Sequence, residues 1–167
     1  MINLLKKKIA RIWAEIHVKN SKKFKENAIM DQEKLLFSLL KIAENTAFGK
    51  EHHFSDIKTI EDFQNRVPVV DYEDIKHYIE QIKQGTPDVL WEGQPLYLAK
   101  TSGTTSGSKY IPITKEGMSY QVQSAQSAIF HYIAQKNTSD FVNGKTIFLQ
   151  GSPELEDLNG IKVGRLS

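Results

Sequence analysis

The sequence predicts a mixed α/β fold. Two short apolar segments, residues 96–99 and 110–113, have the β-prone composition of strands and enclose a loop rich in glycine and hydroxyl side chains. Apolar residues recur at helical spacing before these two segments and after them. The chain has 167 residues, of which 40% are hydrophobic and 25% are charged, as expected for one ordinary globular domain.

The composition excludes several classes of protein. Without cysteine there is no disulfide framework, no thiolate metal site and no cysteine nucleophile. Residues 1–25 hold eight basic residues and one acid, whereas the remainder is net acidic, so the chain is not a globally basic nucleic-acid binder. No segment has the ~20 apolar residues that span a bilayer, and early lysines interrupt any apolar signal core. We expect a cytoplasmic protein without a nucleic-acid or membrane partner.

The first part of the chain is predicted to be mainly helical. Residues 3–19 have a basic, amphipathic pattern, whose apolar positions are Leu5, Ile9, Ile12, Trp13 and Ile16. Such a stripe can pack on the body of the protein, which is the more common arrangement, or lie on an anionic membrane. A second helix is predicted over residues 32–45, with Asp31 as its cap and Gly49 turning the chain after it.

Further cap and turn signals follow. His52 and His53 are explained as solvated or hydrogen-bonded residues more readily than as metal ligands. The segment Thr59-Ile60-Glu61-Asp62 has the pattern of a capping box, and residues 67–70 are predicted to be extended around a proline. Asp71 is the expected cap of a helix over residues 72–83 that Gly85 ends.

The loop between the two predicted strands has the composition of a phosphate-binding loop. Glycines let backbone N–H groups turn toward an anion, hydroxyls add short donors, and a final lysine adds a compact positive charge. A flexible Ser/Gly linker is the alternative, but the flanking apolar segments argue against it. The candidate phosphate contacts are Thr101, Ser102, Gly103, Thr104, Thr105, Ser106, Gly107, Ser108 and Lys109.

A long helix is predicted after the second strand. It covers residues 115–136, between a Thr114 cap and a stop at Asn137. Its apolar positions recur at intervals of three or four residues: Met118, Val122, Ala125, Ile129 and Ile133. Residues 146–149 are predicted to form a buried strand and residues 150–153 a turn after it.

The register of the loop excludes two familiar nucleotide-binding motifs. Counted from Gly103, a Walker motif would need a second glycine where Ser108 stands and a Mg²⁺-binding hydroxyl where Tyr110 stands. The loop also runs into a strand and not into a helix, and the dinucleotide pattern G-x-G-x-x-G is absent.

The residues from Leu98 to Lys109 resemble a different loop. They satisfy every constrained position of the AMP-binding motif of adenylate-forming enzymes, the superfamily of acyl-CoA synthetases, firefly luciferase and peptide-synthetase adenylation domains. The continuation to Thr114 is similar to the auxin-responsive acyl acid-amido synthetase family and its bacterial relatives. Upstream segments at residues 46–49, 61–63, 67–69 and 72–73 are similar to the same family.

This resemblance implies the fold and the chemistry of the family. The chain would be the N-terminal part of a large adenylate-forming domain, with helices followed by the strand-loop-strand segment and a β-α-β stretch. A carboxylic acid would react with ATP to give an acyl-adenylate, and an amino acid would then displace AMP. The loop would hold the β- and γ-phosphates together with Mg²⁺, and no catalytic residue or protein metal ligand is assigned in this chain.

The chain departs from the family in its length. Later motifs for adenine, ribose and Mg²⁺ have no counterpart, and residues 160–167 show no closing feature. We expect one incomplete domain over residues 1–167, divided into a basic helix (1–25), a mainly helical part (26–95) and an α/β part (96–167). Its partner would be the missing C-terminal portion of the same protein, without which it would be inactive. The alternative is a non-catalytic nucleotide- or partner-binding module.

Overall fold

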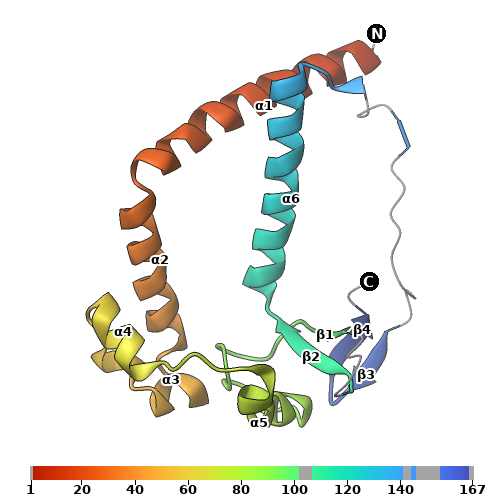
Figure 1. Ribbon diagram of the computed structural model, residues 1–167. Coiled ribbons are helices and arrows are strands. Elements are labelled where there is room, and N and C mark those ends of the chain that lie inside the picture. The colour runs from red at the N-terminus through yellow and green to blue at the C-terminus, as the bar shows by residue number, and fades with distance from the viewer. Residues whose placement is uncertain (1, 102–106, 141–143, 146–154, 166–167) are drawn as a thin grey trace. The chain divides into compact units, whose positions relative to one another are not determined.

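A computed structural model describes residues 2–101, 107–140, 144–145 and 155–165 (Figure 1). Contacts divide the chain into two units, Met1–Asp31 with Glu116–Phe148 and Gln32–Lys115 with Leu149–Ser167. None of the helices in the described ranges is both long and apolar enough to cross a membrane. The elements are α1 (Ile2–Glu26), α2 (Ala28–Ala43), α3 (Ala47–Glu51), η1 (Phe54–Asp56), α4 (Ile60–Arg66), α5 (Tyr72–Lys83), β1 (Tyr97–Thr101), β2 (Lys109–Ile113), α6 (Lys115–Lys136), β3 (Glu156–Leu158) and β4 (Ile161–Arg165).

The first unit contains α1 and α6, and both predicted helices are confirmed. His17 Nε2 lies 2.8 Å from the hydroxyl of Ser127, which links the two helices. Beyond α6, Lys7 Nζ lies 2.6 Å from the carboxylate of Asp140. Asn137 adopts a left-handed conformation with φ 49° directly after α6, so it ends the helix as predicted.

The two helices of the first unit do not meet through the apolar stripe of α1. Within this unit the stripe stays exposed, with exposed fractions from 46% at Ile9 to 64% at Trp13. In α6, only Ile133 of the five apolar positions that recur at helical spacing is buried. The contact side of α1 instead carries Ala14, which is fully buried, and His17 one turn later. Helical spacing reveals an apolar face but not which face a neighbour covers.

In the second unit, the end of α2 is joined closely to α3. Thr46 caps α3, because its hydroxyl donates to the carbonyl of Ala43 at 2.7 Å and accepts from the N–H of Gly49 at 3.0 Å. Two predictions are corrected at this point. Asp31 lies in the first turn of α2 and not at its cap, because the helix already begins at Ala28. Gly49 lies inside α3 and does not turn the chain, because the Thr46 cap starts a new helix there.

The predicted caps of α4 and α5 are confirmed. Thr59 and Asp62 form a reciprocal capping box at the start of α4. Asp71 accepts hydrogen bonds from the N–H groups of residues 73 and 74 at the start of α5. Gly85 follows α5 with φ 88°, a conformation that favours glycine. Val67, directly after α4, has the predicted extended backbone with φ −110° and ψ 100°, and residues 68–70 belong to no helix or strand.

The four strands form one sheet in the order β2-β1-β4-β3. The predicted strands are confirmed as antiparallel neighbours, β1 and β2, while β4 pairs in parallel with the other edge of β1. The hairpin of β3 and β4 was not predicted, although Asn159-Gly160 between two apolar residues is a strong hairpin signal. The predicted strand 146–149 and turn 150–153 lie outside the described residues.

Helix α5 covers one face of this sheet. Tyr78 and Ile82 of α5 pack with Leu98 of β1 and Val163 of β4 in one buried cluster. A second cluster joins Leu40 and Ala43 of α2 to Phe54 and Ile57. At the start of α5, Tyr72 contacts Tyr110 of β2, just after the candidate loop ends.

Candidate phosphate-binding site

The candidate loop closes the antiparallel pair of β1 and β2. In the register of this pair Thr101 lies opposite Lys109, and Lys100 lies opposite Tyr110. The loop therefore leaves the sheet and returns to it at the same point. Of the predicted contacts, the structure describes Thr101, Gly107, Ser108 and Lys109, and the remaining five lie outside the described residues: Ser102, Gly103, Thr104, Thr105 and Ser106.

Gly107 has the backbone conformation that the sequence predicted for a glycine in this loop. Its φ is 85°, in the left-handed region. A β-carbon at this position would meet no atom within 4 Å, so the glycine is explained by its conformation and not by crowding. Left-handed residues can take part in backbone anion sites, and the role of the loop in binding phosphate stays a prediction.

Tyr72, the first residue of α5, contacts the end of the loop in two ways. Its hydroxyl accepts a hydrogen bond of 2.9 Å from the N–H of Tyr110. The ammonium group of Lys109 lies 5.2 Å from the centre of its ring, within the range of a cation–π interaction. The helix that packs on the sheet thus also touches the residue that ends the predicted motif.

Two further lysines contact the ring of Tyr110, the residue that follows Lys109. The ammonium groups of Lys83 and Lys100 lie 4.8 Å and 5.9 Å from the ring centre of Tyr110. Lys83 also contacts both carboxylate oxygens of Glu80, at 2.9 Å each. Lys100 and Lys109 form no ion pair with any carboxylate among the described residues. Their charges remain available to an anion bound at the loop.

The sequence interpretation missed Lys83, Lys100 and Tyr72. Lys100 could have been found, because a hairpin register that pairs residue 101 with residue 109 also pairs Lys100 with Tyr110. Lys83 and Tyr72 lie on α5, and no local pattern indicates that this helix packs beside the loop. Glu80 pairs with Lys83, so the positive charge that can attract a phosphate group at the base of the loop comes from Lys100 and Lys109.

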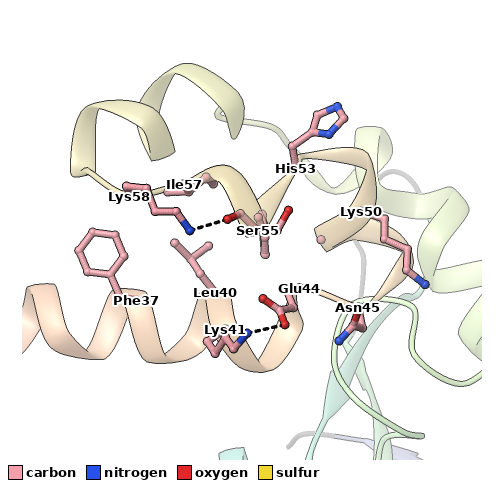
Figure 2. Close-up of a pocket in the computed structure, with 12 residues that line it drawn as sticks. Phe37, Leu40, Lys41, Glu44, Asn45, Lys50, His53, Ser55, Ile57 and Lys58 are labelled. Atoms are coloured by element: carbon pink, nitrogen blue, oxygen red, sulfur yellow. Dashed lines mark hydrogen bonds and ion pairs between the residues drawn. The ribbon is translucent and has the colours of Figure 1, made fainter.

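A separate hollow of about 730 Å³ lies among α2, α3 and η1 (Figure 2). Lys41 contacts Glu44 at 2.7 Å, and Lys58 donates to the carbonyl of Ser55 at 2.6 Å. Dashed lines mark both contacts in Figure 2. Protein groups therefore already engage these two cations, and we assign this hollow no ligand.

His52, which precedes the lining residue His53, is held by a local hydrogen bond. The Nδ1 atom of His52 lies 2.9 Å from the carbonyl oxygen of Arg66, so His52 is hydrogen-bonded as expected. Across the described part of the chain, no three His, Cys, Asp or Glu side chains gather as a metal site would require.

Known proteins share both sequence and fold with this chain. Residues 17–167 match the model of the GH3 family N-terminal domain. An indole-3-acetic acid-amido synthetase of Arabidopsis thaliana, GH3.15, is 34% identical over 106 residues, which are 62% of this chain and 18% of the relative. The jasmonoyl-L-amino acid synthetase JAR4 of Nicotiana attenuata is 29% identical over 105 residues, covering 61% of this chain and 18% of that protein.

Solved structures agree with these relatives. The GH3.15 acyl acid amido synthetase superposes with a TM-score of 0.75 at 23% identity, over 88% of this chain and 27% of that chain. The same synthetase in complex with 2,4-DB gives a TM-score of 0.78 at 23% identity, over 90% of this chain and 26% of that one. These structures show the shared fold. The chain spans about a fifth of the length of the curated relatives it matches, 18% of each of the two named above.

The family match, which covers most of the chain, confirms the resemblance that the loop and its flanking segments indicated. The chain belongs to the GH3 family and represents the N-terminal domain of that family over residues 17–167.

Proposed function

We propose that this chain supplies the phosphate-binding part of an ATP-dependent ligase that joins a carboxylic acid to an amino acid. The observation that carries this proposal is the strand-loop-strand segment of β1 and β2, with Lys109 paired opposite Thr101 at the base of the loop. Membership of the GH3 family supports it, as do relatives named indole-3-acetic acid-amido synthetase and jasmonoyl-L-amino acid synthetase.

The proposed reaction has two steps. A carboxylate oxygen of the acid attacks the α-phosphorus of ATP, the bond to the β-phosphate breaks, and pyrophosphate leaves. The amine of the amino acid then attacks the acyl carbon, loses a proton and displaces AMP, which gives an amide. Neither step needs a nucleophile from the protein, so the work of this chain is positioning and charge stabilisation.

The loop residues act on the pyrophosphate that leaves. The nine residues from Thr101 to Lys109 are proposed to surround the β- and γ-phosphates, with hydroxyls and backbone N–H groups as donors. Lys109 adds a positive charge that no described carboxylate neutralises, and Lys100, paired opposite Tyr110, adds a second one at the start of the loop. Negative charge that accumulates on the leaving group is stabilised by these fixed donors and cations.

Mg²⁺ would accompany the nucleotide in this proposal. The described residues offer no cluster of carboxylates or histidines for a metal ion, and the contribution proposed for this chain is that of the loop and its lysines. The acid, the amino acid and the remaining portion of the enzyme are the proposed partners of this domain.

Acid-dependent exchange of pyrophosphate into ATP tests the proposal in the full-length protein. Lys109→Ala and Thr104→Ala are each expected to lower the exchange rate by on the order of 10²-fold, the usual scale for one electrostatic contact to a transition state. Lys76→Ala is the matched control, because Lys76 lies on α5 and its ammonium group pairs with Glu73 at 3.0 Å. The control is expected to keep the wild-type rate.

Two results would contradict the proposal. Exchange that is unchanged in both loop variants would show that the loop does not hold the reacting phosphates. A wild-type protein that binds ATP but shows no acid-dependent exchange would favour the alternative of a non-catalytic nucleotide-binding module.

A further inference from the structure

We propose that Tyr72 is a positioning residue for the phosphate loop, which it serves by fixing the start of β2 and the direction of the Lys109 ammonium group. Tyr72 contacts Lys109, the last residue of the loop, and Tyr110, the residue that follows it. This inference rests on the proposed function of the loop and assigns a role to a residue outside the motif.

The first contact provides a hydrogen-bond acceptor for a backbone N–H that points away from the sheet. Strand β2 lies at the edge of the sheet, so alternate residues direct their N–H groups away from β1. Tyr110 and Pro112 share this outward direction, and proline has no N–H to satisfy. Tyr110 therefore carries the outward N–H that follows the loop most closely, and the hydroxyl of Tyr72 accepts it at 2.9 Å.

The second contact orients a cation without neutralising it. The Lys109 ammonium lies 5.2 Å from the Tyr72 ring centre, and no described carboxylate contacts it. A carboxylate in place of the ring would compete with phosphate for this cation. An aromatic face restrains the ammonium group and leaves its charge for the ligand.

The position of Tyr72 is itself fixed by its helix. Asp71, the preceding residue, caps α5 by accepting from the N–H of Glu73 at 2.8 Å, and the Asp74 side chain accepts from the Asp71 N–H at 3.0 Å. Further along the helix, Ile79 and Ile82 are buried, with exposed fractions of 1% and 3%. A capped and packed helix gives the loop a rigid support.

Steady-state exchange assays on the full-length protein test this role. Tyr72→Phe removes the acceptor and keeps the ring, and is expected to raise KM for ATP by about 2- to 10-fold, the range of one net hydrogen bond. Tyr72→Leu also removes the ring and is expected to add a further ~2- to 5-fold. Tyr78→Phe is the control on the same helix, because it loses a hydrogen bond to Glu51 away from the loop. It is expected to leave KM for ATP unchanged.

Coupling to Lys109 separates positioning from general support of the fold. In a Lys109→Ala background, Tyr72→Leu is expected to raise KM for ATP by a smaller factor than it does in the wild type, because the cation that the ring orients is gone. An equal factor in both backgrounds overturns the inference. A rise in KM that Tyr78→Phe reproduces also overturns it.

Amide exchange gives a readout that does not need activity. Faster exchange of the Tyr110 N–H in Tyr72→Phe, with the rest of β2 unchanged, supports the contact. An unchanged rate of hydrogen exchange at the Tyr110 N–H overturns the inference even if the enzyme is active. If the wild-type protein shows no acid-dependent exchange of pyrophosphate, the proposed function fails, and the Tyr110 amide alone then decides the role of Tyr72.

Discussion

Gly49 packs so closely against Ala43 that a β-carbon at position 49 would overlap the Ala43 carbonyl oxygen. The same carbonyl accepts a hydrogen bond from the hydroxyl of Thr46, which caps α3. The close approach allows α2 to be followed after three residues by a second helix. Glycine is required here by space, not by an unusual backbone angle.

Gly49→Ala is therefore expected to lower the free energy of unfolding by about 1–3 kcal/mol, since the added methyl group forces the two helix ends apart. Chemical denaturation measures this change. Lys50→Ala, at the exposed neighbouring position of α3, is the control and should stay within about 0.5 kcal/mol of the wild type. Equal losses in the two variants would contradict the steric explanation.

Tyr78 makes the stability of the fold depend on pH in the alkaline range. Burial raises the pKa of Tyr78 to about 12, and its 2.6 Å hydrogen bond to Glu51 acts in the same direction. The folded state keeps the phenol proton that the unfolded chain loses near pH 10.0. This contribution is complete below pH 10.0 and disappears as the pH rises to about 12.

In Tyr78→Phe, the free energy of unfolding should fall less steeply as the pH rises through the alkaline range. At neutral pH it should be about 1 kcal/mol lower than in the wild type, because the hydrogen bond is missing. Denaturation curves collected from pH 8 to 12 (about the range of tyrosine ionisation) provide the test. Tyr120→Phe on α6 is the control, because Tyr120 is 62% exposed. A Tyr78→Phe variant whose stability falls as steeply as that of the wild type would disprove the assignment.

Asp62 makes the stability of the fold decrease as the pH is lowered into the acid range. Hydrogen bonds from the backbone N–H of Lys58 and from Thr59 lower the pKa of Asp62 below its ordinary value of 3.8. The capping box of α4 therefore stabilises the fold above pH 3.8 and loses this contribution as the pH falls through the lower folded-state value.

Asp62→Asn is expected to be less stable than the wild type at pH 7 but to differ less from it in strong acid. The comparison needs denaturation curves at both pH values, with Glu61→Gln as the control in the same helical turn. A difference that stays constant with pH would mean that the Asp62 charge does not stabilise the cap.

The turn between β3 and β4 depends on two left-handed residues. Asn159 has φ 52° and Gly160 has φ 85°, which is the signature of a two-residue hairpin turn. Gly160→Ala is expected to cost about 1 kcal/mol because alanine resists this conformation. No atom lies within 4 Å of a β-carbon at this position, so the cost is conformational.

Gly160→Asn provides the matched comparison, because asparagine tolerates the left-handed region better than alanine does. It should lose less stability than Gly160→Ala in the same denaturation experiment. The reverse order would show that the turn does not govern the stability of this hairpin.

The sequence by itself determined the family and much of the local structure. Caps at Thr59 and Asp71, the α5 boundaries and the strands around the loop were all predicted, because each depends on residues a few positions apart. The motif from Leu98 to Lys109 on its own indicates an adenylate-forming enzyme, and the GH3 match agrees. The role of the loop residues, and the expectation of one incomplete domain, remain predictions.

Only the tertiary structure decided which distant residues meet. The parallel pairing of β1 with β4 joins segments about 65 positions apart, and it places α5 over the sheet beside the loop. That packing brings Tyr72 and Lys83 to Lys100, Lys109 and Tyr110. Periodicity identifies an apolar face, but burial depends on which surfaces meet in the folded chain. For this reason the stripe of α1 could be predicted and its exposure could not.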